Sequence, residues 1–483
     1  MKRKMIQPRV SLCMIVKNEE ANLAPCLEPV AALVDEIVIV DTGSSDGTRE
    51  VAARFGARIF EFPWADSFAA ARNESLRHAV GQWIFWLDGD DRLDNDNRPK
   101  LRSLIADLKD DNIAYVMRCL CPAATAEKSD TLFDHVRLFR NLPGARWQYR
   151  VHEQILPALE SLGAQIQRTD ITIHHTGYQD ETQKARKRER DLRLLLLEDA
   201  EHPGDPYTLF NLGWLYQESG ALNDAWNYYR RSLEWVQPGQ SFAPKLYAMF
   251  ARVCRQLGRA SEALAVCREG LARYPDHPEV LFQQAFCMYV LGDQIGTETS
   301  LLKLLTPTAP ADTSFDFGAD TGLRSYVTRN NLAVLYRDQG RFADAEAQWK
   351  AALAERPSFI DAMLGLGELY LGQNRWEEME NVLAELEAGP QTELQAAVLR
   401  GQKHLARREF DAARNILGGA IKRHPQALGP RLVLSRVLWQ EGKDWAQVEQ
   451  SLRGVLAIDP NNAEARSNLE RLRPGQASQV YVT

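Results

Sequence analysis

The first third of the chain alternates short apolar runs with amphipathic stretches. Between Arg9 and about Ile173, runs such as SLCMIV, EIVIV and WIFWL alternate with amphipathic segments over 20–33, 47–55 and 68–80. A short apolar run bounded by turn residues predicts a buried strand, and apolar residues at helical spacing predict an amphipathic helix. Strand, helix, strand and helix in succession predict an α/β domain with a mainly parallel sheet.

Three of the predicted strands end in a polar or glycine-rich turn. Lys17–Glu19 follow the first strand, Asp41–Gly47 the second, and Asp88–Asp91 the run WIFWL. In open α/β sheets, ligands bind at the carboxyl ends of the strands. These turns are therefore the first places to look for binding or catalytic residues.

The pattern changes beyond Asp205, where strand-like runs disappear and a period of about 34 residues begins. Small, aromatic and proline positions recur at fixed offsets. One unit carries them at Leu212, Gly213, Tyr216, Ala225 and Tyr229, and another at Leu332, Ala333, Tyr336, Ala345, Trp349, Ala352 and Pro357. Small residues let the helices of a unit approach closely, and aromatic residues fill the space between units. This half resembles the tetratricopeptide family, in about seven units.

The two patterns predict a division of the chain into segments. We expect an α/β domain over residues 1–180, a helical linker over 181–204, the repeats over 205–473 with a loop insertion near 306–323, and a flexible tail over 474–483. Repeat solenoids usually present a concave groove to a peptide or protein. A protein partner in that groove is therefore expected, and a spacer or self-association surface is the alternative.

Composition and charge narrow the functional classes. The chain has 483 residues, of which 45% are hydrophobic and 25% charged, as in ordinary folded proteins of more than one domain. A net charge of -7 gives no global attraction to nucleic acid. The basic run Lys184–Arg193 contains Glu189 and Asp191 at helical spacing, which favours a solvated helix face. We therefore expect no nucleic-acid partner.

Cysteine usage and apolar run lengths bear on the compartment. The seven cysteines are scattered and form no C-x-x-C pair of the kind that binds zinc or does redox work. The apolar run that ends before Lys17 is too short for the core of a signal peptide, and no segment approaches the ~20 apolar residues of a membrane span. The sequence therefore predicts reduced thiols, no transmembrane segment and a cytoplasmic location.

The most informative turn contains Asp88-Gly89-Asp90. Two carboxylates spaced i, i+2 at the end of an apolar strand allow the second to ligate a hard divalent cation, while the first reaches a ribose hydroxyl or a metal-bound water. A D-x-D sequence is common by chance, and Asp91, Asp94 and Asp96 would equally suit a solvated turn. The chain contains neither G-x-G-x-x-G after the first strand nor G-x-x-x-x-G-K-[ST], which argues against dinucleotide oxidoreduction and P-loop hydrolysis.

Four segments in order resemble glycosyltransferase family 2, the inverting enzymes with the nucleotide-diphospho-sugar-binding fold called GT-A. They are VSLCMIVKNE at 10–19, IVIVDTGSSDGT at 37–48, Ala71-Arg72-Asn73, and WIFWLDGDD at 83–91. The resemblance covers most of residues 9–178. Its later part looks like a bacterial subgroup often fused to tetratricopeptide repeats, with matching residues at Arg137–Arg140, Trp147, Val151–Glu153 and His175–Tyr178.

The resemblance implies a metal site and a general base. Transfer from a nucleoside diphosphate needs a cation to stabilise the departing diphosphate and a base to take the acceptor's proton. Asp88 and Asp90 are implied to hold Mn²⁺ or Mg²⁺, with His175 as a third ligand. A surface or core histidine is the alternative there. Glu153 is the implied base and His152 its competitor, because the sequence lacks the Glu-Asp pair that marks the base in many family members.

The resemblance also implies a nucleotide-sugar pocket. Asn18 and Glu19 belong to the turn of the first strand, and Asp41 closes the second strand where family members hold the uracil or ribose. Asp88 would contribute to the same pocket, and Arg72 would lie against the nucleotide-sugar, paired to phosphate or to the carboxylates. Helix capping and a local Asx turn are the structural alternatives for Asp41.

Three functions follow from these features. The main hypothesis is a metal-dependent inverting glycosyltransferase that moves a hexose from a nucleotide-sugar, with UDP as the expected carrier, to a protein, peptide or glycan acceptor. The alternative is a tetratricopeptide scaffold with a catalytically inactive transferase-like head. A nucleotidyltransferase is disfavoured, because Val16–Glu19 lacks the glycine-rich loop with Lys or Arg that such enzymes place after the first strand.

Overall fold

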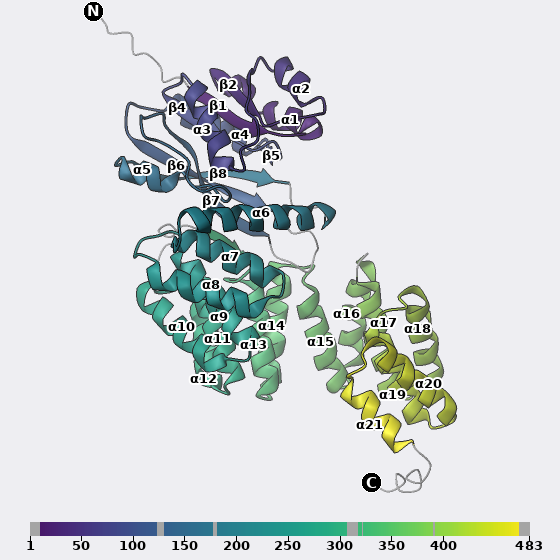
Figure 1. Cartoon of the computed structure of the whole chain (residues 1–483). Helices are drawn as coiled ribbons and strands as arrows, with labels where there is room; N and C mark the ends of the chain where they lie inside the picture. Colours follow the sequence, from purple (N-terminus) through teal and green to yellow (C-terminus); the bar gives the residue numbers. More distant parts are fainter. Residues whose placement is uncertain are drawn as a thin grey trace, which may run out of the picture. The chain divides into compact units, whose positions relative to one another are not determined.

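The structure, a computed structural model, describes residues 10–122, 130–176, 181–306, 317–320, 322–389 and 392–472. The chain forms two compact units, Met1–Thr328 and Arg329–Thr483. The first unit contains the sheet and the first helices of the repeat region, and the second contains the later repeat helices (Figure 1). Among the helices within the described ranges, none combines the length and the apolar character needed to cross a bilayer.

Four parallel strands form one half of the sheet, in the order β3, β2, β1, β4. Their bounds are Arg58–Glu61, Glu36–Asp41, Val10–Val16 and Trp83–Trp86. In this register Val16 of β1 lies opposite Asp41 of β2, and Cys13 lies opposite Trp86 of β4. Because parallel strands end at the same edge, the turns after β1, β2 and β4 are neighbours.

The other half of the sheet is mixed, which corrects the expectation of a mainly parallel sheet. It contains β7, β6, β8 and β5, which span Thr131–Arg140, Ile113–Cys121, Gln165–His175 and Asp91–Arg92. β7 is antiparallel to both β4 and β6. The connection from β6 to β7 is too short for the crossover that a parallel pair would need. β9 (Phe317–Asp320) pairs with β7, so the loop expected over 306–323 contains a strand; residues 307–316 and 321 lie outside the described residues.

Helices cover both faces of the sheet. The sheet and the helices that cover it form the α/β domain, which we call the head. Its helices are α1 (Glu20–Leu27), η1 (Ala31–Leu33), α2 (Thr48–Arg54), α3 (Phe68–His78), α4 (Asn97–Ala106) and α5 (Leu156–Ser161). Alternation along β1 sends Leu12 into one apolar core with Leu23 of α1, and Cys13 into a second core with Ala69 of α3. The sheet is thus buried between two helical layers, and its strand-end edge carries the polar turns.

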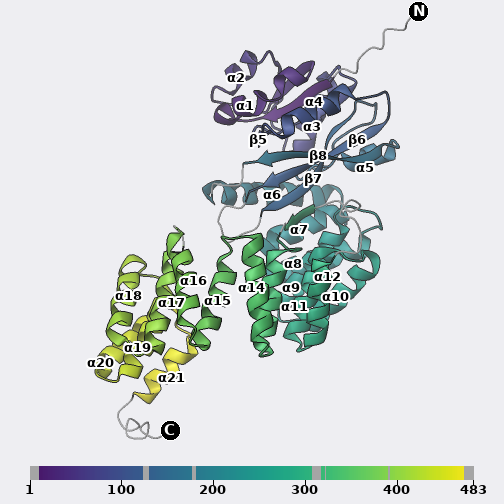
Figure 2. The same ribbon diagram turned by 180° about the vertical axis from the view of Figure 1, so that it is seen from behind.

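The remaining helices of the first unit follow the sheet directly. They are α6 (Glu181–Glu201), α7 (Pro206–Glu218), α8 (Leu222–Trp235), α9 (Ala243–Gln256), α10 (Ala260–Arg273), α11 (Pro278–Val290) and α12 (Gln294–Leu305). α6 lies between the sheet and α7 in both views (Figures 1 and 2). Gly213 of α7 faces Tyr229 of α8, where a Cβ would come within 2.6 Å of the ring, so a small residue is required for this helix pair to close.

The second unit consists of further antiparallel helix pairs. Beginning with α13, which crosses the division between the units, the helices are α13 (Tyr326–Asp338), α14 (Phe342–Glu355), α15 (Ile360–Gly372), α16 (Trp376–Ala388), α17 (Glu393–Ala406), α18 (Phe410–Arg423), α19 (Leu428–Glu441), α20 (Trp445–Ile458) and α21 (Ala463–Arg471). Together with the head, these pairs confirm the predicted fold class, an α/β domain followed by an all-α repeat region.

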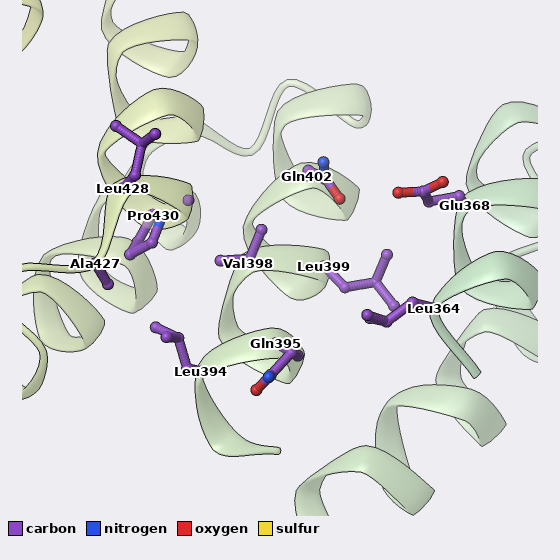
Figure 3. Close-up of a pocket in the computed structure, with 11 residues that line it drawn as sticks. Leu364, Glu368, Leu394, Gln395, Val398, Leu399, Gln402, Ala427, Leu428 and Pro430 are labelled. Carbon is purple, nitrogen blue, oxygen red and sulfur yellow. The ribbon is translucent and has the colours of Figure 1, made fainter. Parts of the chain in front are cut away.

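A mainly apolar cavity of about 330 Å³ opens between helices of the second unit (Figure 3). α15 contributes Leu364 and Glu368, and α17 contributes Leu394, Val398 and Leu399 to its lining. Residues 427–430 at the start of α19 close the remaining side. Helices of successive pairs therefore share one concave surface within this unit.

Candidate active site at the strand ends

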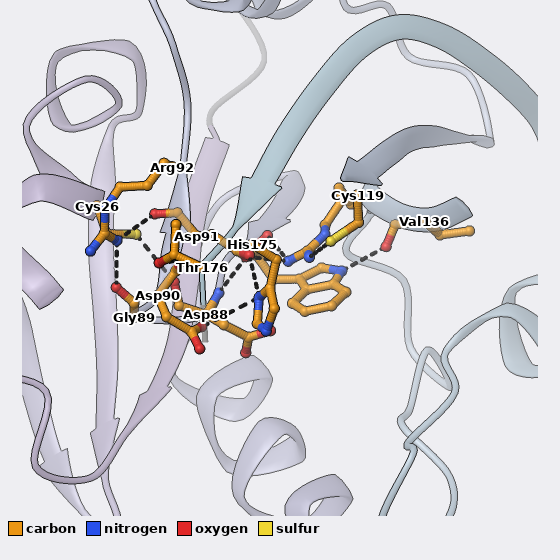
Figure 4. A network of polar contacts seen from close by, with 12 residues as sticks. Cys26, Asp88, Gly89, Asp90, Asp91, Arg92, Cys119, Val136, His175 and Thr176 are labelled. Carbon is orange, nitrogen blue, oxygen red and sulfur yellow. Dashed lines mark hydrogen bonds and ion pairs between the residues drawn. The ribbon is translucent and has the colours of Figure 1, made fainter. Parts of the chain in front are cut away.

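Four side chains with metal-binding chemistry converge after β4. Asp88, Asp90, Asp91 and His175 each offer one ligand atom, and these atoms lie within 4.8 Å of one another (Figure 4). Asp88 and Asp90 lie in the turn after β4, Asp91 is the first residue of β5, and His175 is the last residue of β8. The structure therefore brings together the three residues predicted for the metal and adds Asp91, which the sequence analysis considered only as part of a solvated turn.

The pairing of β5 with β8 places His175 over the turn. Asp91 lies opposite His175 in this antiparallel pair, and Thr176 donates its backbone N–H to the carbonyl of Asp90 at 3.1 Å. Nδ1 of His175 lies 3.0 Å from Oδ1 of Asp91 and 3.4 Å from Oδ1 of Asp90. His174 points to the other side, 2.9 Å from Asp94, as the alternation of an extended strand predicts.

Asp91 is the structural centre of the turn. Its Oδ2 accepts hydrogen bonds from the backbone N–H of Asp88 and from Nη1 of Arg137, both at 2.8 Å. Asp91 and Arg137 are 1% and 2% exposed. The guanidinium of Arg137 also lies 3.8 Å from the ring centroid of Trp86. Asp91 therefore fixes the backbone from which Asp88 and Asp90 project.

The electrostatics of the cluster are those of crowded, buried carboxylates. Burial raises the pKa of Asp90, and the charges of Asp88 and Asp91 raise it further, while His175 opposes them. Burial also works against ionised Asp88, but Arg72, Arg137 and His175 outweigh it and hold the Asp88 pKa below its usual range. Burial lowers the pKa of His175, yet its hydrogen bond to Asp91 and the nearby carboxylates raise it to about 9.

This cluster fits a divalent cation. Carboxylate oxygens are the ligands that Mg²⁺ and Mn²⁺ prefer, and an imidazole is compatible with Mn²⁺. Burial is the main cause of the raised pKa of Asp90, the charges of Asp88 and Asp91 add to it, and a bound cation would stabilise the ionised carboxylates. The resemblance implies Asp88, Asp90 and His175 as the residues that would hold the ion, and Oδ2 of Asp91 is engaged by Arg137 and the Asp88 backbone.

Arg72 connects the cluster to the predicted base. Its Nη2 lies 2.7 Å from Oδ1 of Asp88, and its Nε lies 2.5 Å from Oε1 of Glu153. The guanidinium is also near the rings of Trp86 and Trp147, 4.2 and 4.9 Å from their centroids. Arg72 thus pairs with carboxylates, one of the two roles that the sequence predicted for it.

The two candidate bases occupy different positions. Glu153 has a side chain that is 13% exposed and tied to Arg72. His152 is exposed and adopts a left-handed backbone conformation with φ of 55°. The structure therefore joins Glu153, through Arg72, to the carboxylate cluster, while His152 faces solvent.

The turns after β1 and β2 interlock beside the cluster. Asn18, with φ of 57°, donates its backbone N–H to Oγ of Ser44 at 3.0 Å, and its Oδ1 accepts the N–H of Ser45 at 2.8 Å. Asp41 accepts the N–H of Ser44 at 2.9 Å and pairs with Arg49. Burial opposes ionised Asp41, but these hydrogen bonds hold its pKa below the usual value. Asp41 therefore makes the local turn hydrogen bond that the sequence analysis gave as the structural alternative to nucleotide binding.

Glu19 links the first turn to the carboxylate cluster. Burial raises its pKa, and the charges of Asp90 and Asp88 act in the same direction, while a hydrogen bond from Asn22 opposes them. A Cβ at Gly89 would lie 2.9 Å from Cγ of Glu19. Glycine at the centre of Asp88-Gly89-Asp90 is therefore required for the close approach of the two turns.

The sequence interpretation missed Arg137 and Cys119. The sequence analysis named Arg137 only as part of the segment Arg137–Arg140 that resembles the bacterial subgroup, and gave it no role. Cys119 received no role either, and it lies close to Asp91 and His175. A weak signal for Arg137 was a charged residue between the apolar residues Val136 and Leu138. Such a residue is buried only with a partner, and that partner is Asp91.

An α/β sheet with carboxylates at its strand ends, followed by helical repeats, defines a GT-A-type head on a tetratricopeptide region. Residues 11–147 match the family glycosyl transferase family 2, and residues 244–287, 330–391 and 398–463 match tetratricopeptide repeats. The chain therefore carries a glycosyl transferase family 2 domain joined to tetratricopeptide repeats.

Curated relatives named for tetratricopeptide repeats or as glycosyltransferases each match a part of the chain. A TPR repeat-containing protein of Synechococcus elongatus is 34% identical over 53% of this chain and 64% of its own length. The SPbeta prophage-derived glycosyltransferase SunS of Bacillus subtilis is 24% identical over 43% of this chain and 49% of its own. An uncharacterized glycosyltransferase of Rickettsia typhi is 27% identical over 25% of this chain and 41% of its own. The chain thus matches from about two fifths to just under two thirds of these relatives' lengths.

Proposed function

We propose that the protein is a metal-dependent inverting glycosyltransferase that moves a hexose from a nucleotide-sugar to a protein, peptide or glycan acceptor. UDP is the proposed nucleotide. The observation that carries the proposal is the cluster of Asp88, Asp90, Asp91 and His175 at the strand ends, next to the interlocked turns of Asn18 and Asp41. The family match of the head supports the reaction class.

The proposed donor site divides the work among three turns. Asp88, Asp90 and His175 would hold Mn²⁺ or Mg²⁺, which supplies charge stabilisation for the departing diphosphate. Asn18, Glu19 and Asp41 would bind the nucleoside, where carboxylate and amide oxygens accept hydrogen bonds from base N–H or ribose O–H. Arg72 would stay on Asp88 and fix the carboxylate that faces the donor.

Glu153 is the proposed general base. The acceptor nucleophile bonds to the anomeric carbon as the bond from that carbon to the diphosphate oxygen breaks, and the acceptor's proton passes to the Glu153 carboxylate. Attack opposite to the leaving group inverts the anomeric centre. Because Arg72 bonds Oε1 of Glu153 at 2.5 Å, the carboxylate has a fixed position relative to Asp88. His152, one residue away, is the second candidate.

The cavity of the second unit supports a partner role for the repeats. Its lining by Leu364, Leu394, Val398 and Leu399 is apolar, with Glu368 at its side. We propose that it receives an apolar side chain of a protein or peptide, either the acceptor or another partner. A scaffold with an inactive head would use the same surface, so the state of the head decides between the two functions.

The test is turnover of nucleotide-sugars by the full chain. UDP-hexoses and their N-acetyl forms are incubated with Mn²⁺ or Mg²⁺ and an extract of candidate acceptors, and released nucleoside diphosphate is measured. The proposal expects release that needs the cation and is lost with a chelator or in Asp90→Ala. Failure of every nucleotide-sugar to bind or react, in a folded chain, would favour the scaffold.

A further inference from the structure

The segment that carries Glu153 is bound from outside by the helices α6 and α7. Residues 147–154 form a small closed loop, in which the backbone N–H and C=O of Gln148 and Gln154 exchange hydrogen bonds of 2.9 and 3.0 Å. From the head, the side-chain amide of Asn73 donates to the backbone carbonyl of Trp147 at 3.0 Å and accepts the backbone N–H of Trp147 at 2.8 Å. These contacts fix the two ends of the loop on the head. The middle of the loop extends toward α6 and α7.

The helix α6 holds Arg150. The carboxylate of Glu198, which is 6% exposed, accepts the backbone N–H of Arg150 at 2.8 Å. The Arg150 guanidinium pairs with Glu201 at 2.5 Å and also donates to the carbonyl of Asp66 at 3.1 Å. The carbonyl of Arg150 accepts the N–H of Phe68, the first residue of α3, at 2.8 Å. Arg150 is therefore attached to the head and to α6 at once.

The helix α7 holds the residues on both sides of Glu153. The hydroxyl of Tyr207 donates to the carbonyl of His152 at 3.0 Å and accepts from Nε2 of Gln154 at 2.8 Å. The ring of Tyr149 packs on that of Tyr207 with centroids 4.8 Å apart. Tyr207 is 4% exposed, so these contacts are shielded from water.

The loop adopts a backbone conformation that needs such external support. Tyr149 and His152 have φ of 71° and 55°, in the left-handed region that non-glycine residues seldom occupy. Such conformations persist only where the surrounding structure determines them. Val151 adds to this support by packing with Leu194 and Leu212 of α6 and α7.

We propose that Tyr207 and Glu198 are positioning residues for the candidate base. By holding the backbone of residues 150–154, they place the Glu153 carboxylate against Arg72, and α6 and α7 thereby form part of the catalytic structure. The proposal rests on the proposed function, because it assigns a role relative to Glu153. It makes α6 and α7 more than a linker and a partner surface.

Tyr207→Phe in the full chain is the principal test. The substitution keeps the ring and removes the hydroxyl that contacts His152 and Gln154. We expect kcat to fall about tenfold or more, because a displaced catalytic group loses much of its effect. The KM for the nucleotide-sugar and the affinity for UDP with Mn²⁺ should stay unchanged. Tyr229→Phe is the matched control, since that hydroxyl donates to Gln217 of the repeats at 3.0 Å and not to the 147–154 loop, and it should leave kcat unchanged.

Two substitutions of Glu198 test its hydrogen bond with the backbone N–H of Arg150. Glu198→Gln retains an oxygen that can accept the N–H of Arg150, whereas Glu198→Leu does not. We expect the Gln variant to keep most of the activity and the Leu variant to lose kcat as Tyr207→Phe does. Equal effects of the two variants, or a parallel loss of UDP affinity, would overturn the positioning role.

Amide hydrogen exchange separates this inference from the proposed function. In Tyr207→Phe, the amides of Arg150 and Gln154 should exchange on the order of tenfold faster, while those of β1 and β4 keep their rates. Unchanged exchange at both amides overturns the anchoring. If the wild-type chain turns over no nucleotide-sugar but the exchange rises as expected, the transferase proposal fails and the anchoring stands.

Discussion

Asp90 and Asp91 are adjacent in the sequence but have opposite environments. Asp91 is almost completely buried and pairs with Arg137, which itself is buried. His175 lies near Asp90 as a positive partner, and burial with two neighbouring carboxylates raises the Asp90 pKa. At the scale of single residues, one aspartate therefore builds the turn, and the other is available to a cation.

Substitution of the two aspartates should separate these roles. Asp90→Ala should abolish cation-dependent UDP binding and leave the free energy of unfolding nearly unchanged, because the residue lies in a polar turn. Asp91→Asn should lower the free energy of unfolding by about 3–5 kcal/mol, because it leaves the Arg137 charge buried without its partner. Calorimetric titration with UDP and Mn²⁺, together with denaturant unfolding, measures both effects. Similar stability losses in the two variants would contradict the assignment.

Glu153→Gln should separate chemistry from binding. The amide keeps the size of the side chain but cannot take the acceptor's proton, so kcat should fall on the order of 10²- to 10⁴-fold with donor affinity retained. Single-turnover rates and UDP titrations provide the measurement. His152→Ala should have a small effect. If it removes activity while Glu153→Gln does not, the base is one residue earlier in the chain.

At the scale of helices and strands, the repeat region depends on close approach between helices. Gly365 of α15 faces the indole of Trp349 in α14, whose Nε1 donates to Asn330 at 2.9 Å. A methyl group at Gly365 would overlap this ring. Gly418 lies in α18 with open space around the position of a Cβ. The two glycines therefore occupy helix interiors for different reasons.

Alanine at these two glycines should shift stability in opposite directions. Gly365→Ala should lower the free energy of unfolding of the second unit by about 1–3 kcal/mol, because the ring and the helices must move apart. Gly418→Ala should raise it by up to about 1 kcal/mol, because alanine favours a helix more than glycine does. Denaturant unfolding followed by circular dichroism measures both. Stabilisation by Gly365→Ala would contradict the described packing.

Local patterns predicted the elements, and long-range contacts determined the site. The turn Asp88-Gly89-Asp90 was predictable because a single apolar strand leads into it. The pairing of Arg137 with Asp91 and of Arg72 with Glu153 joins residues 46 and 81 positions apart, which no spacing rule connects. The antiparallel strands β7 and β9 were missed for the same reason, since strand partners depend on topology rather than on periodicity.

At the scale of the whole molecule, the first compact unit joins the α/β head with α6 to α12. The functional boundary proposed near residue 180 thus falls inside one structural unit. The contacts of Glu198 and Tyr207 with the 147–154 loop explain why the head and the first repeats belong together. The second unit contains the apolar cavity and is the proposed place for a partner.

The central claim is a cation-dependent nucleotide site at the strand ends of the head. The most direct measurement is calorimetric titration of UDP into the full chain, with and without Mn²⁺, for the wild type and for Asp90→Ala. The account predicts saturable one-to-one binding in the wild type only when Mn²⁺ is present, with a matching rise in melting temperature, and no binding in Asp90→Ala. Binding of equal strength without the cation, or binding that Asp90→Ala leaves intact, would contradict it.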